Sequence, residues 1–360
     1  MKAILPTLFS LALLALAPAA QAQPTVWTVN ADETVGADFT DLPEAIAAAN
    51  EGDIIYIAGS TENYGQIDPV RIDKPLLIYG PGYLLAQNKL QSGGSTLPAR
   101  VFSITIGEGG DGTLIAGLTI NNLDINNVSS VYIRSNCITE EIDCYNVGYV
   151  LFAQNLLYGY DDYSNIFREM NFRIDGCSEV IITHNILLSA RVEDFYRNGD
   201  ITLIHNFIAD TEINESEGSI SFSYNVFSDV DLRYNWAWRS AQCDNNLFLQ
   251  DCNVPYTAQN KGSNVFDVPM QNVYPRLVND LSDALDYYGE RIFIPEPGSA
   301  AININQTGKD AGPFGGSEPY TLAGLPNIPR ISSVEAPHFS TTSQGITVRL
   351  TLAPEPTQDQ

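Results

Sequence analysis

The chain has 360 residues, with 43 acidic and 18 basic side chains and a formal net charge of −25. Lysine is absent between Lys89 and Lys261. Such a surface repels nucleic acid and anionic membranes, which excludes those partners. It favours a soluble extracellular protein, a divalent-cation binder, or a partner with neutral or cationic groups. The length is sufficient for one large domain or two smaller ones.

The first 22 residues are typical of a secretory signal peptide. Lys2 provides a positive start, residues 4–16 form an apolar core, and residues 20–22 (Ala-Gln-Ala) match a cleavage site. The apolar run is too short to span a membrane, and no later uncharged segment reaches the roughly 20 residues that a span needs. We therefore predict a secreted protein, periplasmic or at the cell surface, without a membrane span.

A short amphipathic helix is expected just after residue 40. Asp41 and Glu44 have the spacing of a capping box, in which side chains satisfy the free backbone N–H groups at the start of a helix. One apolar face is formed by Ala45, Ile46 and Ala49. Gly52 favours the end of the helix, ahead of the first predicted strand.

Six segments in the middle of the chain share the pattern apolar, any, apolar, any, any, Asn, any, apolar. They are 131–138 (VYIRSNCI), 150–157 (VLFAQNLL), 180–187 (VIITHNIL), 201–208 (ITLIHNFI), 220–227 (ISFSYNVF) and 241–248 (AQCDNNLF). Their aligned asparagines are Asn136, Asn155, Asn185, Asn206, Asn225 and Asn246, spaced 19 to 30 residues apart. The alternation ahead of each Asn is that of a strand, and this period predicts a β-solenoid whose coils pack on their neighbours.

Stacking of the coils, roughly 4.8 Å apart, would turn equivalent positions into columns. We interpret the Asn column as a structural ladder. Asn tolerates left-handed backbone better than other non-glycine residues, so we expect it to take that conformation at the bend between strands. Stacked amides can also hydrogen-bond along the column.

The repeat resembles that of the right-handed parallel β-helix proteins, the pectin-lyase-like superfamily of secreted bacterial proteins. The N-terminal stretch TVNADETVGADFTDLPEAIAAANEGDIIYIAGSTENY resembles the entry segment of that family, and residues 298–316 (GSAAININQTGKDAGPFGG) resemble its closing segment. The resemblance covers roughly residues 25 to 316. It implies an all-β domain over residues 23–316, with a helical cap at its N-terminal end.

The composition changes after Gly316. Residues 317–352 begin as a Pro/Gly-rich linker and contain two stretches, RISSVEA and GITVRLTLA, that could form one β-hairpin. Residues 353–360 are expected to be a disordered tail. Among the five cysteines, Cys137 with Cys144 and Cys243 with Cys252 are the local candidates for disulfides, since export permits pairing.

The residues before the asparagines form a second column: Ser135, Gln154, His184, His205, Tyr224 and Asn245. His184 and His205 are expected on adjacent coils, with Tyr224 one coil further. A His/Tyr cluster could perform acid–base chemistry, and Arg191 is a further catalytic candidate by its location. The alternative is that these side chains only stack along a solvated edge.

A third column predicts a carboxylate patch four and six residues after Asn206 and Asn225, formed by Asp210, Glu212, Asp229 and Asp231. Like charges on adjacent coils are unfavourable unless a cation or an arginine lies between them. Ca²⁺ takes six to eight oxygen ligands and would suit this patch. Arg191, one coil earlier, could instead pair with Glu212, and a solvated face screened by salt is the remaining alternative.

The coil between Asn155 and Asn185 is longer than the others, and the candidate binding residues of its insertion are Tyr158, Tyr160, Tyr163 and Phe167. Loops that stand out from a rigid solenoid often shape a binding groove. These rings could stack on sugar rings or could pack back on the coil.

The resemblance is specific for the fold and does not specify an activity. Lyases of the superfamily cleave uronic-acid polymers, with Ca²⁺ acidifying the proton beside the carboxylate and an arginine removing it. The sequence lacks the arginine-containing signature of pectate lyases. It also lacks the paired-Asp and Gly-His-Gly segments of galacturonan hydrolases, because its three histidines (His184, His205 and His338) are not flanked by glycines. We therefore predict a non-catalytic secreted protein that binds a polysaccharide or another cell-surface component. The alternatives are a polysaccharide lyase or glycoside hydrolase, and a purely structural or adhesive module.

Overall fold

The computed structural model describes residues 23–65, 69–88, 96–161, 166–168, 170–193, 198–213, 219–230, 241–253, 262–277, 285, 287–328, 330–335 and 349–353. The predicted signal peptide and residues 354–360 of the predicted tail lie outside these ranges. Among the described residues, no helix is long and apolar enough to cross a bilayer.

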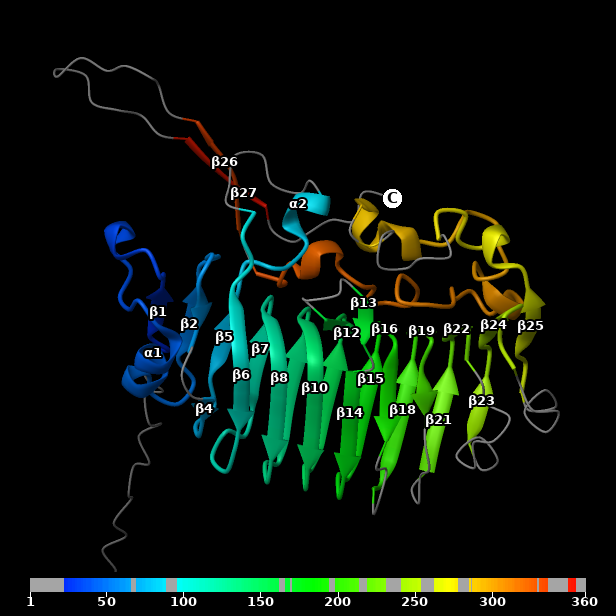
Figure 1. The fold of residues 1–360 in the computed structure, drawn as a ribbon, viewed down its shortest axis with the longest axis horizontal. Coiled ribbons are helices and arrows are strands. Elements are labelled where there is room, and N and C mark those ends of the chain that lie inside the picture. Colours follow the sequence, from blue (N-terminus) through cyan, green and yellow to red (C-terminus); the bar gives the residue numbers. More distant parts are fainter. Residues whose placement is uncertain are drawn as a thin grey trace, which may run out of the picture.

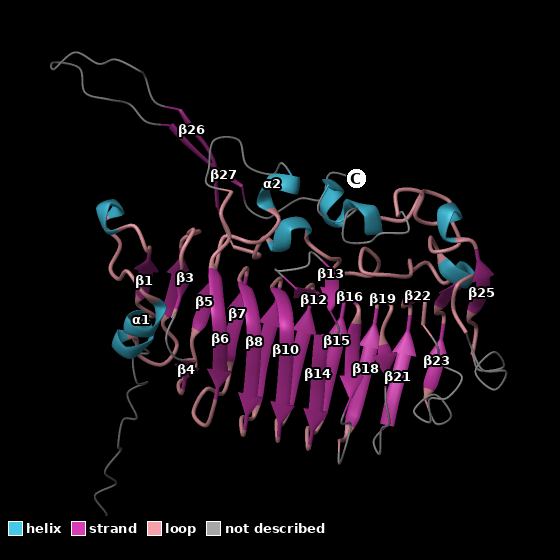
Figure 2. Ribbon diagram, in the orientation of Figure 1, coloured by secondary structure: helices cyan, strands magenta, loops and turns pink. Residues whose placement is uncertain are grey.

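The fold is predominantly β and solenoid-like, and its strands form two long parallel stacks (Figures 1 and 2). The ten-stranded sheet contains, in spatial order, β1 (Val26–Val29), β2 (Ile54–Ile57), β5 (Leu77–Tyr79), β7 (Thr113–Ala116), β9 (Ser130–Arg134), β11 (Tyr149–Ala153), β15 (Glu179–Thr183), β18 (Asp200–Ile204), β21 (Ser219–Ser223) and β23 (Gln242–Asp244). Neighbouring strands in this sheet are parallel, so equivalent residues of successive coils lie side by side, as the repeat predicts.

The main path of the fifteen-stranded sheet contains β20 (Glu212–Ile213), β17 (Ala190–Glu193), β14 (Met170–Asp175), β10 (Cys137–Tyr145), β12 (Leu156–Asp161), β16 (Ile186–Leu188), β19 (Phe207–Ala209), β22 (Val226–Ser228), β24 (Leu247–Leu249) and β25 (Val265–Val268). Joined to it are β3 (Asn63–Tyr64), β4 (Val70–Ile72), β6 (Arg100–Ile106), β8 (Thr119–Asn126) and β13 (Ile166–Arg168). β13 belongs to the long coil and pairs antiparallel with β12.

The alternating residues of each repeat divide between the core and the surface. In β15, Val180 and Ile182 are buried while Ile181 between them is partly exposed. Val180 lies between Val150 and Ile201 of the adjoining coils. Stacking these apolar residues buries a continuous core that no coil could form alone.

The asparagine ladder is confirmed. Each of the six asparagines is fully buried. The side-chain oxygen of Asn185 accepts the backbone N–H and the side-chain amide of Asn155, at 2.8 and 2.9 Å, and the same pair of bonds continues along the column to Asn264. The second amide hydrogen of Asn185 reaches the carbonyl of Phe152, so the ladder satisfies polar groups that the bend buries.

The prediction that these asparagines take the left-handed conformation is wrong, because the residue before each of them does so. Positive φ angles of 53° to 60° occur at Ser135, Gln154, His184, His205, Tyr224 and Asn245. The left-handed residue turns the chain, and the following Asn keeps its amide directed into the ladder. The histidines therefore occupy the corner of the coil.

The predicted helix is α1 (Leu42–Ala48), and Asp41 is its N-cap. The Asp41 carboxylate accepts the N–H groups of Leu42 and Gly65, each at 2.8 Å. Buried residues of this helix join the core of the first coils, and its contacts are with β1, β2 and β4. The Lys74 ammonium donates to the carbonyls of Ile46 and Ala49 near the C-terminal end of α1, where a cation is favourable.

After the last coil, residues 287–328 form a segment that we call the return strap. Its Glu296 bonds Val273 beside the last coils, so the strap returns only from about residue 304 onward. From Asn305, which bonds Asn245, it lies over the left-handed corners between Asn245 and Ser135, here called the corner column, and it reaches Tyr83 of the N-terminal coils through Ala323 (Figure 1). It contains the 3-10 helices η3 (Gly289–Phe293), η4 (Ile304–Gln306) and η5 (Leu322–Gly324). Other short helices in the part of the chain that the structure describes are η1 (Glu33–Val35), η2 (Met270–Asn272) and α2 (Leu85–Asn88). Phe293 and Ile304 pack against Phe207 and Leu247 in a second apolar core. Strands β16, β19 and β24 are consequently buried on both faces, which explains their uninterrupted apolar sequences.

A buried polar cluster joins the beginning of the strap to its later part. Glu290 is fully buried, and its carboxylate accepts the Tyr320 hydroxyl at 3.3 Å and the Ala323 N–H at 3.0 Å. The Tyr320 and Tyr83 hydroxyls are 2.5 Å apart. Beyond the strap, β26 (Arg330–Glu335) and β27 (Arg349–Ala353) form an antiparallel pair, as the sequence predicts.

The predicted local disulfides are absent, since all five cysteines are free thiols. Cys137 and Cys144 begin and nearly end the single strand β10, which separates them by roughly 20 Å at the rise of an extended chain. Cys137 faces the core under the strap, whereas Cys144 faces the interior of the coils. Cys243 and Cys252 are also unbridged.

Candidate functional site

The corner column places His184, His205 and Tyr224 on successive coils, as the repeat predicts. The rings of His184 and His205 stack with centroids 4.9 Å apart, and those of His205 and Tyr224 with centroids 5.0 Å apart. Each ring projects from a left-handed corner that follows a strand of the ten-stranded sheet. The spacing of the coils alone accounts for this stacking.

The return strap covers the two imidazoles. The exposed fractions of His184 and His205 are 7% and 4%. Nε2 of His184 is 3.0 Å from the carbonyl of Gly315, which can only accept, so Nε2 carries the proton. A Cβ added at Gly316, where φ is +73°, would lie 2.9 Å from Nε2 of both histidines, so the strap requires glycine at this contact.

Burial keeps both imidazoles neutral. The pKa of His184 is lowered to about 3, by burial and then by the neighbouring His205. The pKa of His205 is lowered to about 4, by burial and then by the Lys309 ammonium. An acid–base catalyst works best with a pKa near the operating pH and within reach of its substrate. In this arrangement the two histidines are instead covered by the return strap and contact its backbone at Gly315 and Gly316.

Arg191, the fourth catalytic candidate, lies on β17 on the other sheet. Its backbone is in register with Asn171 and with Glu212, as the predicted arginine–glutamate pairing requires. The corner column and Arg191 therefore belong to different faces of the coil.

Half of the predicted carboxylate patch can be located. Asp210 and Asp229 occupy left-handed corners of successive coils, and the Ser189 hydroxyl donates to Asp210 at 2.7 Å. Burial raises the pKa of Asp229, as do the negative charges of Asp210 and Asp251. The side chain of Glu212 and the whole of Asp231 lie outside the described residues.

Among the described residues, no group of three or more His, Cys, Asp or Glu side chains has the arrangement of a metal site. The calcium prediction rests on four carboxylates, of which two are described. It stays a prediction that a titration can decide.

The aromatic insertion forms the β12–β13 pair. Tyr158 packs against the core under the strap and is partly exposed. The backbones of Tyr160 and Phe167 are paired across the two strands, while their side chains and Tyr163 lie outside the described residues. Tyr158 thus follows the alternative in which an aromatic residue packs back on the coil.

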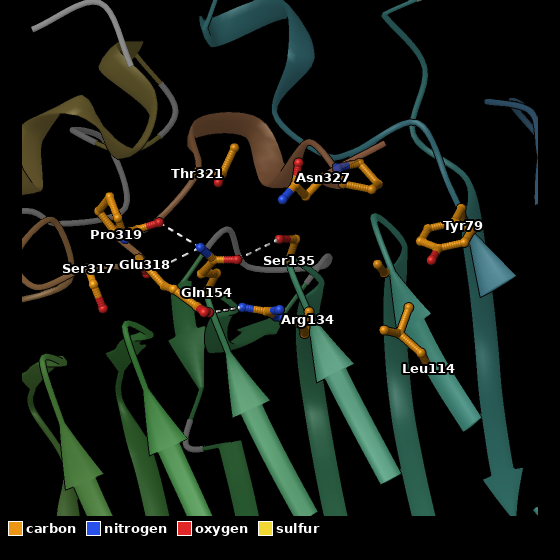
Figure 3. A pocket seen from close by; sticks show the side chains of 12 residues that line it. Tyr79, Leu114, Arg134, Ser135, Gln154, Ser317, Glu318, Pro319, Thr321 and Asn327 are labelled. Carbon is orange, nitrogen blue, oxygen red and sulfur yellow. Dashed lines mark hydrogen bonds and ion pairs between the residues drawn. The ribbon is translucent and has the colours of Figure 1, made fainter. Parts of the chain in front are cut away.

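A groove that the sequence analysis did not identify lies between the N-terminal half of the ten-stranded sheet and the return strap (Figure 3). It encloses about 520 Å³. The sheet side contributes Tyr79, Leu114, Arg134, Ser135 and Gln154, and the strap contributes residues 317–319, 321, 326 and 327. The groove therefore exists only because the strap returns over these coils.

The polar groups of the groove hold the strap in place. Nη2 of Arg134 lies 2.5 Å from a carboxylate oxygen of Glu318, and the Gln154 amide donates to the Pro319 carbonyl at 2.6 Å. Nε of Arg134 is buried and has no hydrogen-bond partner among the described residues. Opposite these groups, Tyr79 and Leu114 provide an apolar wall (Figure 3). An apolar wall facing a few fixed polar groups is the usual composition of a small-ligand site.

A charged array lies on the outward face of the fifteen-stranded sheet. Asp124 and Asp143 are in register on adjacent coils, and Arg173 follows on the next. Arg173 bonds Glu141 at 2.6 Å and Asp143 at 3.2 Å. Burial raises the pKa of Asp124, and the charge of Asp143 raises it further. These carboxylates could not be predicted as a site from the sequence, because they precede no conspicuous motif and lie outside the Asn-aligned segments.

No protein-family model matches the chain, and no curated protein or solved structure matches it either. The case for any function therefore rests on the residues of this chain.

Proposed function

We propose that the chain is a right-handed parallel β-helix protein of the pectin-lyase-like type, exported through the signal peptide of residues 1–22. In this proposal α1 closes the N-terminal end of the helix. Support comes from the two stacks of parallel strands, the buried asparagine ladder, and the contacts of α1 with the first coils. The protein would then act in the periplasm or at the cell surface.

We propose further that it binds a glycan or another surface component without cleaving it, and that the groove of Figure 3 is the binding site. The groove itself is the observation that carries this proposal. Its ionisable lining residues are Tyr79, Arg134 and Glu318, and the two charged ones neutralise each other. It offers an apolar wall and hydrogen-bonding groups but no unpaired acid or base.

A glycan array probed with the mature protein tests this function. We expect binding to at least one glycan and at least a tenfold loss of affinity in Arg134→Ala, because a donor group of the groove is removed. Arg71→Ala is the matched control, since Arg71 is exposed on β4, in the other sheet. The proposal would be rejected if no glycan on the array bound the protein, or if Arg134→Ala bound with wild-type affinity.

A polysaccharide lyase or hydrolase is the second candidate, and the Asp124–Asp143–Arg173 array favours it. A carboxyl group with a raised pKa beside a carboxylate held by an arginine has the composition of an acid and base pair. The test is a screen of neutral and acidic polysaccharides for new reducing ends and for unsaturated uronate products. Turnover that Asp124→Asn abolishes would establish catalysis, and no turnover on any polymer would remove this candidate.

A further inference from the structure

The outward face of the ten-stranded sheet carries a continuous apolar row. Seven residues on consecutive coils are in register with one another: Val26, Ile54, Leu77, Leu114, Tyr132, Leu151 and Ile181. Val26 is 50% exposed, and the other six are partly exposed. We call these residues the apolar row. With about 4.8 Å between coils it extends for roughly 29 Å along the solenoid axis.

Tyrosines flank the apolar row on both sides. Tyr56 and Tyr79 lie two residues further along their strands and stack with ring centroids 5.7 Å apart. Tyr149 lies on the other side and contacts Tyr132, with centroids 5.8 Å apart. The row leads into the groove of Figure 3, because Leu114 and Tyr79 also line that groove.

The apolar row is a local feature and not a general property of the outward faces. Beyond Ile181, the same column continues with Thr202, Ser221 and Gln242. On the other sheet, outward positions of the central coils carry Asn122, Asp124, Glu141, Asp143 and Arg173. An exposed apolar surface confined to one part of a soluble protein is typical of an interaction site.

Charge selects among the possible occupants of this surface. The chain carries a net charge of −25, so a second copy, an anionic membrane or a polyanion is repelled. The apolar row contains no carboxylate and no basic residue, and the one arginine at its groove end is paired with Glu318. A uronate polymer would therefore meet no unpaired cation at the apolar row, and the net negative charge of the protein would repel it.

We propose that the apolar row and the groove bind a neutral, unbranched polysaccharide that lies along the solenoid axis. Apolar C–H faces of its sugars would stack on the tyrosine rings and aliphatic side chains, as aromatic platforms favour. Its edge hydroxyls would bond the Arg134 and Gln154 groups in the groove. This inference rests on the proposed glycan-binding function and specifies the class of glycan and the surface that holds it.

Binding is measured by depletion of the mature protein from solution by insoluble cellulose and chitin, and by calorimetry with soluble neutral oligosaccharides, polygalacturonate and alginate. The test variant is Tyr132→Ser/Leu151→Ser, since Ser221 shows that this column accepts a hydroxyl. Thr202→Ala, one coil beyond the apolar row, is the control. Circular dichroism and the melting temperature establish that the variants are folded.

We expect binding to a neutral polysaccharide with little dependence on salt, and at least a tenfold loss of affinity in the double variant only. Binding restricted to uronate polymers, and weakened by salt, would overturn the neutral class and leave the proposed function intact. Neutral-glycan binding that the double variant retains but Arg134→Ala loses would overturn the role of the apolar row and keep the groove. If no glycan bound, both this inference and the proposed glycan-binding function would be overturned. If the wild type formed a dimer that the double variant did not form, the apolar row would instead be the contact surface for a second copy.

Discussion

The two buried histidines predict a loss of stability between pH 7 and pH 5. His184 and His205 have folded-state pKa values of about 3 and about 4, below their ordinary value of 6.5. A depressed pKa means that the unfolded chain binds protons more readily than the folded chain. The contribution of these imidazoles is therefore fully present above pH 6.5 and is lost as the pH falls toward 4.

The size of the effect follows from the pKa differences. At pH 5 the unfolded histidines are almost fully protonated, whereas the folded ones stay neutral. Lowering the pH from 7 to 5 then costs about 2 kcal/mol per histidine, or about 4 kcal/mol for the pair. This is a large fraction of the stability of an ordinary domain. Protonation would also place cations beneath the strap, close to Lys309.

The assay is urea unfolding followed by circular dichroism at pH 7, 6 and 5. His184→Gln/His205→Asn is the matched variant, because Gln154 and Asn245 occupy the same left-handed corner in other coils. The difference in unfolding free energy between wild type and variant isolates the two histidines from the carboxylates. We expect wild type to lose about 4 kcal/mol more than the variant between pH 7 and pH 5. Equal losses in both proteins would refute the assignment of neutral, buried imidazoles.

Three further predictions concern the ladder, the strap and the carboxylate patch. Asn206→Ala should lower the free energy of unfolding by about 3 kcal/mol, because it leaves buried donors and acceptors unpaired. Asn264→Ala, at the end of the ladder, should lower it by about 1 kcal/mol. Equal losses in chemical denaturation would contradict this difference. Gly316→Ala should lower the melting temperature well beyond Gly308→Ala. Both glycines have positive φ, but only Gly316 would meet the imidazoles, so matching effects would exclude that contact. The calcium hypothesis predicts heat on titration with millimolar Ca²⁺ that Asp229→Asn abolishes, and the absence of heat from wild type removes it.

The sequence by itself determined the repeating part of this protein. Each coil places the same residue types at the same positions, so the period of the pattern predicts both the parallel stacks and the ladder from Asn136 to Asn246. Inward residues such as Val180 and Ile182 follow from the alternation alone. The conformation of the corner was predicted one residue away from its true place, because Asn tolerates left-handed backbone but is needed here for its amide.

Only the tertiary structure decided what covers the corner column. The contacts of the return strap join residues far apart in the sequence, such as Gly315 with His184 and Pro319 with Gln154, and these contacts have no period. No local pattern therefore indicates that the histidines are buried and that the groove beside Arg134 is formed by the strap. Residues in one column of the repeat acquire different surroundings because a non-repeating segment lies over some coils and leaves the face beside them open.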